Sequence, residues 1–300
     1  MPIRAASYQS DGRGMQELLS AVWPLGPHPG GLGWLMATGQ LGDRALVAVE
    51  DGDVIGWAAL PGGGELMAQV EPGRDAAARE LIGAALQLSG DKALRVAVTD
   101  LDETMRDALI AHDFLSGTET TEGMWMDAGA VPEETSAEYS VRAVRPDEAA
   151  ARVAVHRAAW RPADMPWHPD HRPAVDAGAT SSFSEEAYAR CRATWLYDAD
   201  LDLVVVAPDG AFAGSCLAWL DPSTGVAELE PMGIHPEHRR FGLAGLLCRE
   251  VARRVAARGG LEVFINAGWP DGYPAPRAAY TKVGFRTVKR GNVYARPASS

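Results

Sequence analysis

The chain has 300 residues, of which 47% are hydrophobic and 23% charged, and a formal net charge of −12 at pH 7. This composition is ordinary for a globular protein long enough to form two domains, and its acidity argues against a nucleic-acid partner, which would need a basic face. No apolar run approaches the roughly 20 residues that span a bilayer, and the first residues lack the apolar core of a signal peptide. We therefore expect a cytoplasmic protein without a membrane partner.

The three cysteines, Cys191, Cys216 and Cys248, are an odd number and have no metal-ligand spacing. We expect buried thiols in a reducing compartment rather than disulfides or a cysteine nucleophile.

A metal site is a weaker alternative, carried by His168 and His171 in the sequence HPDH, with His156 as a third ligand. Proline and turn residues around them fix no common helical face, and no cysteine or carboxylate pair completes a shell. We therefore expect no metal.

In chain order, one series of elements occurs twice. A short strand and an amphipathic segment ending in Ala-Val-Trp or Ala-Ala-Trp come first, followed by a hairpin with an Asp-Gly turn. A strand followed by a helix comes third, and a strand followed by a segment ending in phenylalanine closes the series. The first copy comprises residues 3–6, 21–23, 45–60, 66–86, 94–98 and 108–114, and the second comprises residues 141–144, 158–160, 203–220, 230–255, 261–265 and 279–285.

Four matching elements in the same order predict a duplicated domain. The expected fold is mixed α/β, with mostly antiparallel sheets flanked by helices. A polar, proline-containing stretch places the boundary, which gives domains at residues 1–132 and 139–300 joined by a linker at residues 133–138.

Residues 229–254 form the most informative stretch. A strand interrupted by Pro231-Met232-Gly233 leads into a turn, and a helix follows whose apolar residues recur every three or four positions until Gly259-Gly260. The first N–H groups of a helix lack intrahelical partners and carry the positive end of its dipole, so this turn can hold an anion. Arg239 and Arg240 add positive charge, and the small Gly242 and Ala244 let a phosphate approach the backbone.

At this point the chain resembles the GNAT family of acyl-CoA-dependent N-acyltransferases. The family's R/Q-x-x-G-x-G/A segment is present as residues 239–244, with the Ile234-x-Pro236 step before it and the sequence AYTKVGF at residues 279–285 after it. The resemblance implies two tandem GNAT-like domains and acetyl-CoA as co-substrate. It also implies a cofactor site, for which the expected residues are Met232, Gly233, Ile234, Arg239, Arg240, Phe241, Gly242, Leu243, Ala244, Gly245 and Asn266.

The first copy lacks this pattern. Without a gap, Val70 aligns with Ile234 and Pro72 with Pro236, which places Asp75 at Arg239, Ala78 at Gly242 and Glu80 at Ala244. In the closing element, Leu109 stands where the second copy has Tyr280, and Asp113 where it has Gly284. We expect domain 1–132 to be degenerate, domain 139–300 to be catalytic, and one cofactor to bind per chain.

The strand before the turn provides the expected chemistry. Pro231 and Gly233 predict a bulge that splays the strand from its neighbour, so that the N–H of Met232 or Ile234 can bind the thioester carbonyl and the oxyanion formed on attack. A protonated amine needs a base. Glu228 and Glu230 alternate with Met232 and Ile234 on one face, and we prefer Glu230, although either glutamate could instead be solvated or bind the acceptor.

Two further assignments follow from the resemblance. Tyr280 matches the tyrosine that protonates the leaving thiolate. Residues 160–202, rich in proline, tryptophan and histidine, form either a wall of the acceptor site or a packed surface loop.

The predicted function is acetyl transfer from acetyl-CoA to a primary amine of a small molecule, such as an antibiotic, amino sugar, polyamine or amino-acid-like compound, by direct attack in a ternary complex. The alternatives are a non-catalytic acyl-CoA sensor and an acyltransferase with a longer acyl group or a hydroxyl acceptor. The protein is expected to be a monomer or homodimer.

Overall fold

The computed structural model describes residues 2–90, 92–129, 136, 138–266 and 272–298. Most of the predicted linker 133–138 and residues 267–271 lie outside the described part. The chain divides into two compact units, Met1–Glu122 with Lys289–Ser300, and Gly123–Val288. We call them unit 1 and unit 2.

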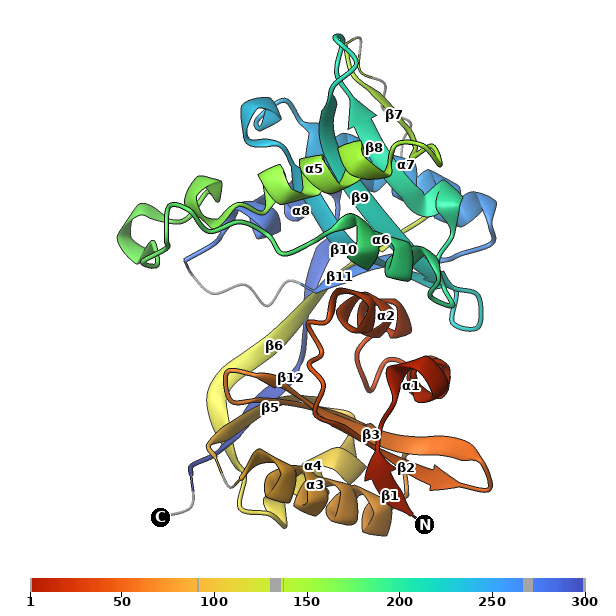
Figure 1. Ribbon diagram of the computed structural model, residues 1–300, viewed down its shortest axis with the longest axis vertical. Coiled ribbons are helices and arrows are strands. Elements are labelled where there is room, and N and C mark those ends of the chain that lie inside the picture. Colours follow the sequence, from red (N-terminus) through yellow and green to blue (C-terminus); the bar gives the residue numbers. More distant parts are fainter. Residues whose placement is uncertain (1, 91, 130–135, 137, 267–271, 299–300) are drawn as a thin grey trace. The chain divides into compact units, whose positions relative to one another are not determined.

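Unit 1 is a sheet in the order β1-β2-β3-β4-β5-β12 (Figure 1). The helices α1 and α2 pack on one hydrophobic cluster and α3 and α4 on another. Its elements are β1 (Ile3–Ala5), α1 (Tyr8–Val22), α2 (Pro29–Thr38), β2 (Ala45–Glu50), β3 (Asp53–Gly62), β4 (Glu65–Val70), α3 (Asp75–Ser89), β5 (Leu94–Thr99), α4 (Glu103–Ile110), the first part of β6 (Leu115–Asp127) and the last part of β12 (Arg286–Arg296).

Unit 2 is a sheet in the order β6-β11-β10-β9-β8-β7. Its elements, besides the parts of β6 and β12 that it contains, are β7 (Ser140–Ala143), α5 (Ala149–Ala159), η1 (Pro162–Asp164), η2 (Pro169–His171), α6 (Glu185–Arg192), η3 (Ala199–Leu201), β8 (Asp202–Val206), β9 (Phe212–Asp221), β10 (Val226–Ile234), η4 (Pro236–His238), α7 (Leu243–Ala257), β11 (Glu262–Asn266) and α8 (Ala275–Val283).

Each unit is completed by the last strand of the other half of the sequence. In unit 1, β12 pairs antiparallel with β5 over residues 291–296 and 94–99. In unit 2, β6 pairs antiparallel with β11 over residues 123–127 and 262–266. The compact units therefore differ from the continuous ranges 1–132 and 139–300, because a contribution from a distant strand leaves no signal in a local pattern.

The two units repeat the same backbone details, as their sequences predict. Both hairpins turn through an Asp-Gly pair, with Asp51 at φ 52°, Gly52 at φ 99° and Gly210 at φ 89°. The turns that follow α4 and α8 also match, since Asp113 at φ 62° holds the place of Gly284 at φ 117°. These left-handed positions favour glycine and tolerate aspartate. The fold is mixed α/β, with two GNAT-like halves.

In unit 2, α5 and α7 cover opposite faces of the sheet (Figure 1). The predicted apolar stripe of α7 is confirmed, because Leu243, Leu246, Leu247, Val251 and Val255 are all buried in one core cluster. Burial of each such side chain contributes about 1.5–3 kcal/mol before entropy is subtracted, so α7, and with it the turn that precedes it, is held firmly on the sheet.

A buried ion pair positions α5 on the other face. The Arg152 Nε donates to Asp202 Oδ1 over 3.0 Å, and neither side chain is exposed. The second carboxylate oxygen of Asp202 accepts hydrogen bonds from the hydroxyls of Tyr188, at 2.6 Å, and Tyr197, at 3.2 Å. This network joins α5, α6 and β8.

Among the described residues, no helix combines the length and the apolar character that crossing a membrane requires.

Candidate active site

The site is built around an irregularity in β10. The register between β10 and β9 shifts between Leu229 and Met232, which pair with Ala218 and Cys216, so that two residues of β10, Glu230 and Pro231, lie opposite one of β9. On its other side, within the described residues, β10 pairs with β11 only from Val226 to Glu228. The bulge and the splaying that Pro231 predicts are therefore confirmed.

Beyond the bulge, alternate N–H groups of β10 face the splayed side. The N–H of His235 donates to Ala213 O on β9 over 2.9 Å. Because bonding direction alternates along an antiparallel strand, Gly233 also bonds toward β9, whereas Met232 and Ile234 direct their N–H groups away from it. These are the two N–H groups predicted to meet a thioester.

The same bulge contradicts one prediction, that Glu228, Glu230, Met232 and Ile234 share a face. Leu229 packs in the α7 core cluster, Met232 packs against that cluster, and Met232 Sδ lies 3.9 Å from Cys248 Sγ of α7. Glu228 lies on the opposite face, where Asn266 Nδ2 donates to its Oε1 over 2.8 Å. An inserted residue in a strand reverses the alternation, so the period of two does not hold across it.

The turn before α7 has the backbone that an anion cradle requires. Arg240 at φ 72° and Gly242 at φ 76° are both left-handed, and α7 begins at Leu243. The first helical hydrogen bond at this end runs from Leu246 N to Gly242 O, so the N–H groups of Leu243, Ala244 and Gly245 belong to the turn of the helix that has no intrahelical acceptor. Leu243 contributes only its backbone, because its side chain is buried.

The remaining side chains of this turn differ in position. Arg240 is exposed, and Phe241 is 62% exposed and lies 6.0 Å from the Tyr139 ring. The guanidinium of Arg239 instead donates to the carbonyl oxygens of Ile234 at 3.3 Å, Ala159 at 3.1 Å and Asp164. Burial lowers the pKa of Arg239. Arg239 is thus engaged with backbone rather than directed at the anion cradle.

A cavity of about 500 Å³ connects these features within unit 2. It runs past Met232, Gly233 and Ile234 of β10, the start of α7 and the side chain of Tyr280 on α8. The lining residues that were not predicted as cofactor ligands include Trp160, Arg249, Tyr273 and Lys282. Arg249 follows Gly245 by one helical turn and Lys282 follows Tyr280 by two residues, so both could have been found by extending the motif along its helices. Tyr273 follows an irregular segment that gives no periodic signal.

Glu230 has the raised pKa expected of a base, but it is not among the described residues that line the cavity. It is half-buried, and desolvation raises the pKa of its carboxyl from 4.5 to about 7. Its backbone carbonyl accepts a 2.6 Å hydrogen bond from Trp219 Nε1, which fixes the bulge. Glu228 is only 1% exposed, and the side-chain amide of Asn266 donates a hydrogen bond to it. Asn266, which was predicted to bind the cofactor, therefore contacts Glu228 instead.

Tyr280 is 5% exposed and packs against Phe285, with ring centroids 5.7 Å apart. Desolvation, followed by nearby Cys248, Cys216 and Glu230, raises the pKa of its hydroxyl well above 10.0. Tyr280 therefore stays protonated at neutral pH and lines the same cavity as Met232. That is the protonation state and the place that a proton donor to a leaving thiolate needs.

The proline-rich segment after α5 borders the cavity through Trp160 and Pro166. It is tied to the lead-in of α8, where His168 N donates to Gly272 O over 2.7 Å and the rings of Trp167 and Tyr273 lie 5.1 Å apart. The rings of His168 and His171 lie 5.2 Å apart. No group of three metal-binding side chains occurs in the part of the chain that the structure describes.

The corresponding place in unit 1 is built differently. Residues 71–74 connect β4 to α3, whereas residues 235–242 connect β10 to α7. The gapless alignment of Ala78 with Gly242 is therefore wrong, because Ala78 lies inside α3 and Gly242 precedes α7. Asp75 is the first residue of α3, and its Oδ1 accepts a 3.3 Å hydrogen bond from Thr104 Oγ1. A carboxylate at the helix start occupies the position that an anion would favour.

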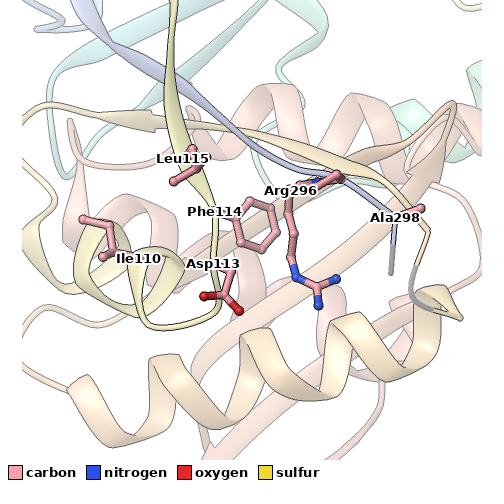
Figure 2. A pocket seen from close by; sticks show the side chains of 7 residues that line it. Ile110, Asp113, Phe114, Leu115, Arg296 and Ala298 are labelled. Carbon is pink, nitrogen blue, oxygen red and sulfur yellow. The ribbon is translucent and has the colours of Figure 1, made fainter. Parts of the chain in front are cut away.

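Unit 1 does contain hollows. One of about 390 Å³, at the starts of α3 and α4, is lined by Asp75, Asp102, Glu103 and Asp107 among others, so its charge opposes a diphosphate. A second, of about 610 Å³, lies between the end of α4 and the end of β12, where Phe114 and Arg296 face each other across it (Figure 2). The first does contain a left-handed glycine, Gly73 at φ 82°, two residues before α3, but its N–H already donates to Thr104 Oγ1 over 2.9 Å.

Comparisons with known proteins agree with this geometry. The sequence model described as "Acetyltransferase (GNAT) family" matches residues 152–285, which include β10, the turn, α7 and Tyr280. No significant match was found among curated proteins.

Three solved structures resemble the whole chain. The tandem GNAT protein from the clavulanic acid biosynthesis pathway is 19% identical at a TM-score of 0.58, with 100% of this chain and 99% of that one covered. A GNAT-family acetyltransferase from Colwellia psychrerythraea is 15% identical at a TM-score of 0.59, covering 98% and 99%. A GCN5-related N-acetyltransferase from Sphaerobacter thermophilus is 17% identical at a TM-score of 0.53, covering 98% and 95%.

At these identities the structural likeness shows the fold, and the family match gives the activity class. Residues 152–285 match the acetyltransferase (GNAT) family model, and this match supports an acyltransferase enzyme.

Proposed function

We propose that unit 2 transfers the acetyl group of acetyl-CoA to a primary amine of a small molecule, by direct attack of the amine in a ternary complex. One observation carries the proposal: a single cavity joins the unsatisfied N–H groups at the start of α7 to the splayed edge of β10 and to Tyr280.

The residues fit a CoA thioester. A diphosphate would accept hydrogen bonds from the N–H groups of Leu243, Ala244 and Gly245, with Arg240, Arg249 and Lys282 supplying charge at the cavity wall. The N–H groups of Met232 and Ile234 would donate to the thioester carbonyl oxygen and to the oxyanion that replaces it, because both face the splayed side of β10.

Glu230 would take the proton from the ammonium group of the acceptor. A carboxyl with a pKa of about 7 is a far better base than one at 4.5, and direct transfer to solvent from an amine with a pKa near ~10.4 is unfavourable at neutral pH. The neutral amine then forms the new C–N bond, and the C–S bond breaks as Tyr280 gives its proton to the departing sulfur. The nitrogen of the new amide loses its surplus proton, which restores the Tyr280 hydroxyl.

The test is a thiol-release assay with acetyl-CoA over a panel of polyamines, amino sugars, aminoglycosides and amino-acid amides. The proposal expects at least one amine to give thiol release matched by an acetylated product of equal amount. Tight binding of acetyl-CoA with no turnover against the whole panel would favour a non-catalytic sensor instead.

A further inference from the structure

The first arginine of the motif lies in an unexpected place. In a turn that can hold phosphate, Arg239 would be assigned to the phosphate by its charge alone. Its guanidinium instead contacts backbone carbonyls of three separate elements: Ile234 at the end of β10, Ala159 at the end of α5, and Asp164 in η1.

We propose that Arg239 is a positioning residue that holds the wall segment, residues 160–171, over the cavity, and that it is not the phosphate ligand of the turn. The inference rests on the proposed function, because it gives this segment the task of bordering the acceptor.

The contact with Ala159 places the positive charge of Arg239 at the C-terminal end of α5, where a cation is favourable. Ala159 is the last residue of α5, and the last carbonyl groups of a helix lack intrahelical donors and carry the negative end of its dipole. The guanidinium of Arg239 satisfies one of these carbonyls over 3.1 Å. Its planar, forked donors can reach a second carbonyl, that of Asp164, at the same time, which a lysine ammonium on a flexible stem would not do with the same geometry.

The helix end that Arg239 holds lies directly against the strand of the site. A Cβ built on Gly233 would lie 2.7 Å from Ala159 Cβ and 3.0 Å from Trp160 Nε1. Any outward movement of the end of α5 would therefore separate Trp160 from the strand edge that the thioester would follow.

The far end of the wall segment has its own anchors. The rings of Trp167 and Tyr273 lie 5.1 Å apart, and His168 N donates to Gly272 O over 2.7 Å. Arg172 Nη2 also donates to Ala163 O over 2.9 Å, but this bond lies within the same stretch of chain. The wall segment is thus held at both ends, and Arg239 holds the end nearer to α5. Loss of the Arg239 contacts should increase the mobility of residues 160–166 and leave the rest of the wall segment attached.

The proposal expects phosphate binding to be independent of Arg239, although Arg239 also lines the cavity. The N–H groups at the start of α7 remain available, and Arg240, Arg249 and Lys282 line the same cavity. The exposed Arg240, its neighbour in sequence, is the matched comparison, since it has the same charge and lies in the same turn but makes no contact with the wall segment that the structure records.

The test uses the full-length protein with coenzyme A as the probe. Hydrogen exchange would be followed in peptides covering residues 160–171, and the Kd for coenzyme A would be measured by calorimetry, for wild type, Arg239→Gln and Arg240→Gln. Arg253→Gln, on the exposed side of α7, is the control for removing an arginine elsewhere.

We expect Arg239→Gln to speed exchange in residues 160–166 at least about tenfold, with the Kd for coenzyme A changed by less than about threefold. Arg240→Gln should show the opposite pattern, and Arg253→Gln neither change. If Arg239→Gln folds poorly, Arg239→Lys provides the same comparison, with exchange intermediate between wild type and the fully loosened segment.

An amine identified by thiol release adds a kinetic readout: Arg239→Gln should raise the KM for the amine more than the KM for acetyl-CoA. A Kd for coenzyme A that rises as much in Arg239→Gln as in Arg240→Gln, with exchange in residues 160–166 unchanged, overturns the inference. Failure of every amine to react would reject the proposed function alone, because the exchange and binding results do not require turnover.

Discussion

Replacement of Glu230 by glutamine should raise the stability of the protein relative to wild type as pH increases, and lower its activity. Burial raises the pKa of this carboxyl from 4.5 to about 7. In the unfolded chain the group ionises near pH 4.5, so between pH 4.5 and pH 7 the folded state binds more protons and stability falls as pH rises.

The magnitude follows from the shift. A difference of 7 − 4.5 pKa units corresponds to a cost of about 3 kcal/mol, fully present above pH 7 and absent below pH 4.5. Glutamine has the same shape and does not ionise. The free energy of unfolding of Glu230→Gln, relative to wild type, should therefore rise by about 3 kcal/mol from pH 4.5 to pH 8.

Urea denaturation at closely spaced pH values measures this difference, with the exposed Glu237→Gln as the control. Over the same range, kcat/KM of the wild type for an amine substrate should rise to a shoulder near pH 7, and Glu230→Gln should lose that shoulder and about 100-fold in rate. Glu228→Gln should retain the shoulder. A stability difference independent of pH, or a shoulder retained in Glu230→Gln and lost in Glu228→Gln, would refute the reasoning.

Three further changes test other parts of the site. Tyr280→Phe should lower kcat about 10- to 100-fold while the Kd for coenzyme A stays within about twofold, because the hydroxyl would act only on the leaving sulfur; unchanged turnover across pH would remove Tyr280 from the mechanism. Gly242→Ala and Gly259→Ala place a methyl group in open space at φ 76° and 79°, at the two ends of α7, so each should lose about 1–2 kcal/mol of stability by denaturation, but only Gly242→Ala should weaken coenzyme A binding. Asp202→Asn should lose about 3–5 kcal/mol, because Arg152 would stay buried without its counter-charge, whereas Tyr197→Phe, at the longer contact, should lose less than about 1.5 kcal/mol.

Much of the fold could be predicted from sequence because its elements carry local signals. The Asp-Gly turns predict the hairpins, the spacing of apolar residues by three or four positions predicts α7, and Pro231 predicts the bulge. The exchange of β6 and β12 between units could not be predicted, because the residues that pair are far apart in sequence and each strand would fit either sheet.

The site was predictable where it depends on backbone, and less so where it depends on side-chain direction. Gly242 and the start of α7 lie as the motif implies. The direction of Arg239 could not be read from its charge, because its partners are carbonyls of residues 159 and 164, and the opposite faces of Glu228 and Met232 depend on where the bulge inserts its extra residue. Tyr273 lines the cavity but could not be predicted, because it lies in a segment with no periodic pattern.

The central claim is that one of two duplicated halves holds the whole cofactor site. A calorimetric titration of the full chain with coenzyme A tests it most directly. The account predicts one equivalent bound per chain, with binding weakened by Gly242→Ala and unaffected by Asp75→Asn at the corresponding helix start of unit 1. Two equivalents per chain, or binding that depends on Asp75 and not on Gly242, would contradict it.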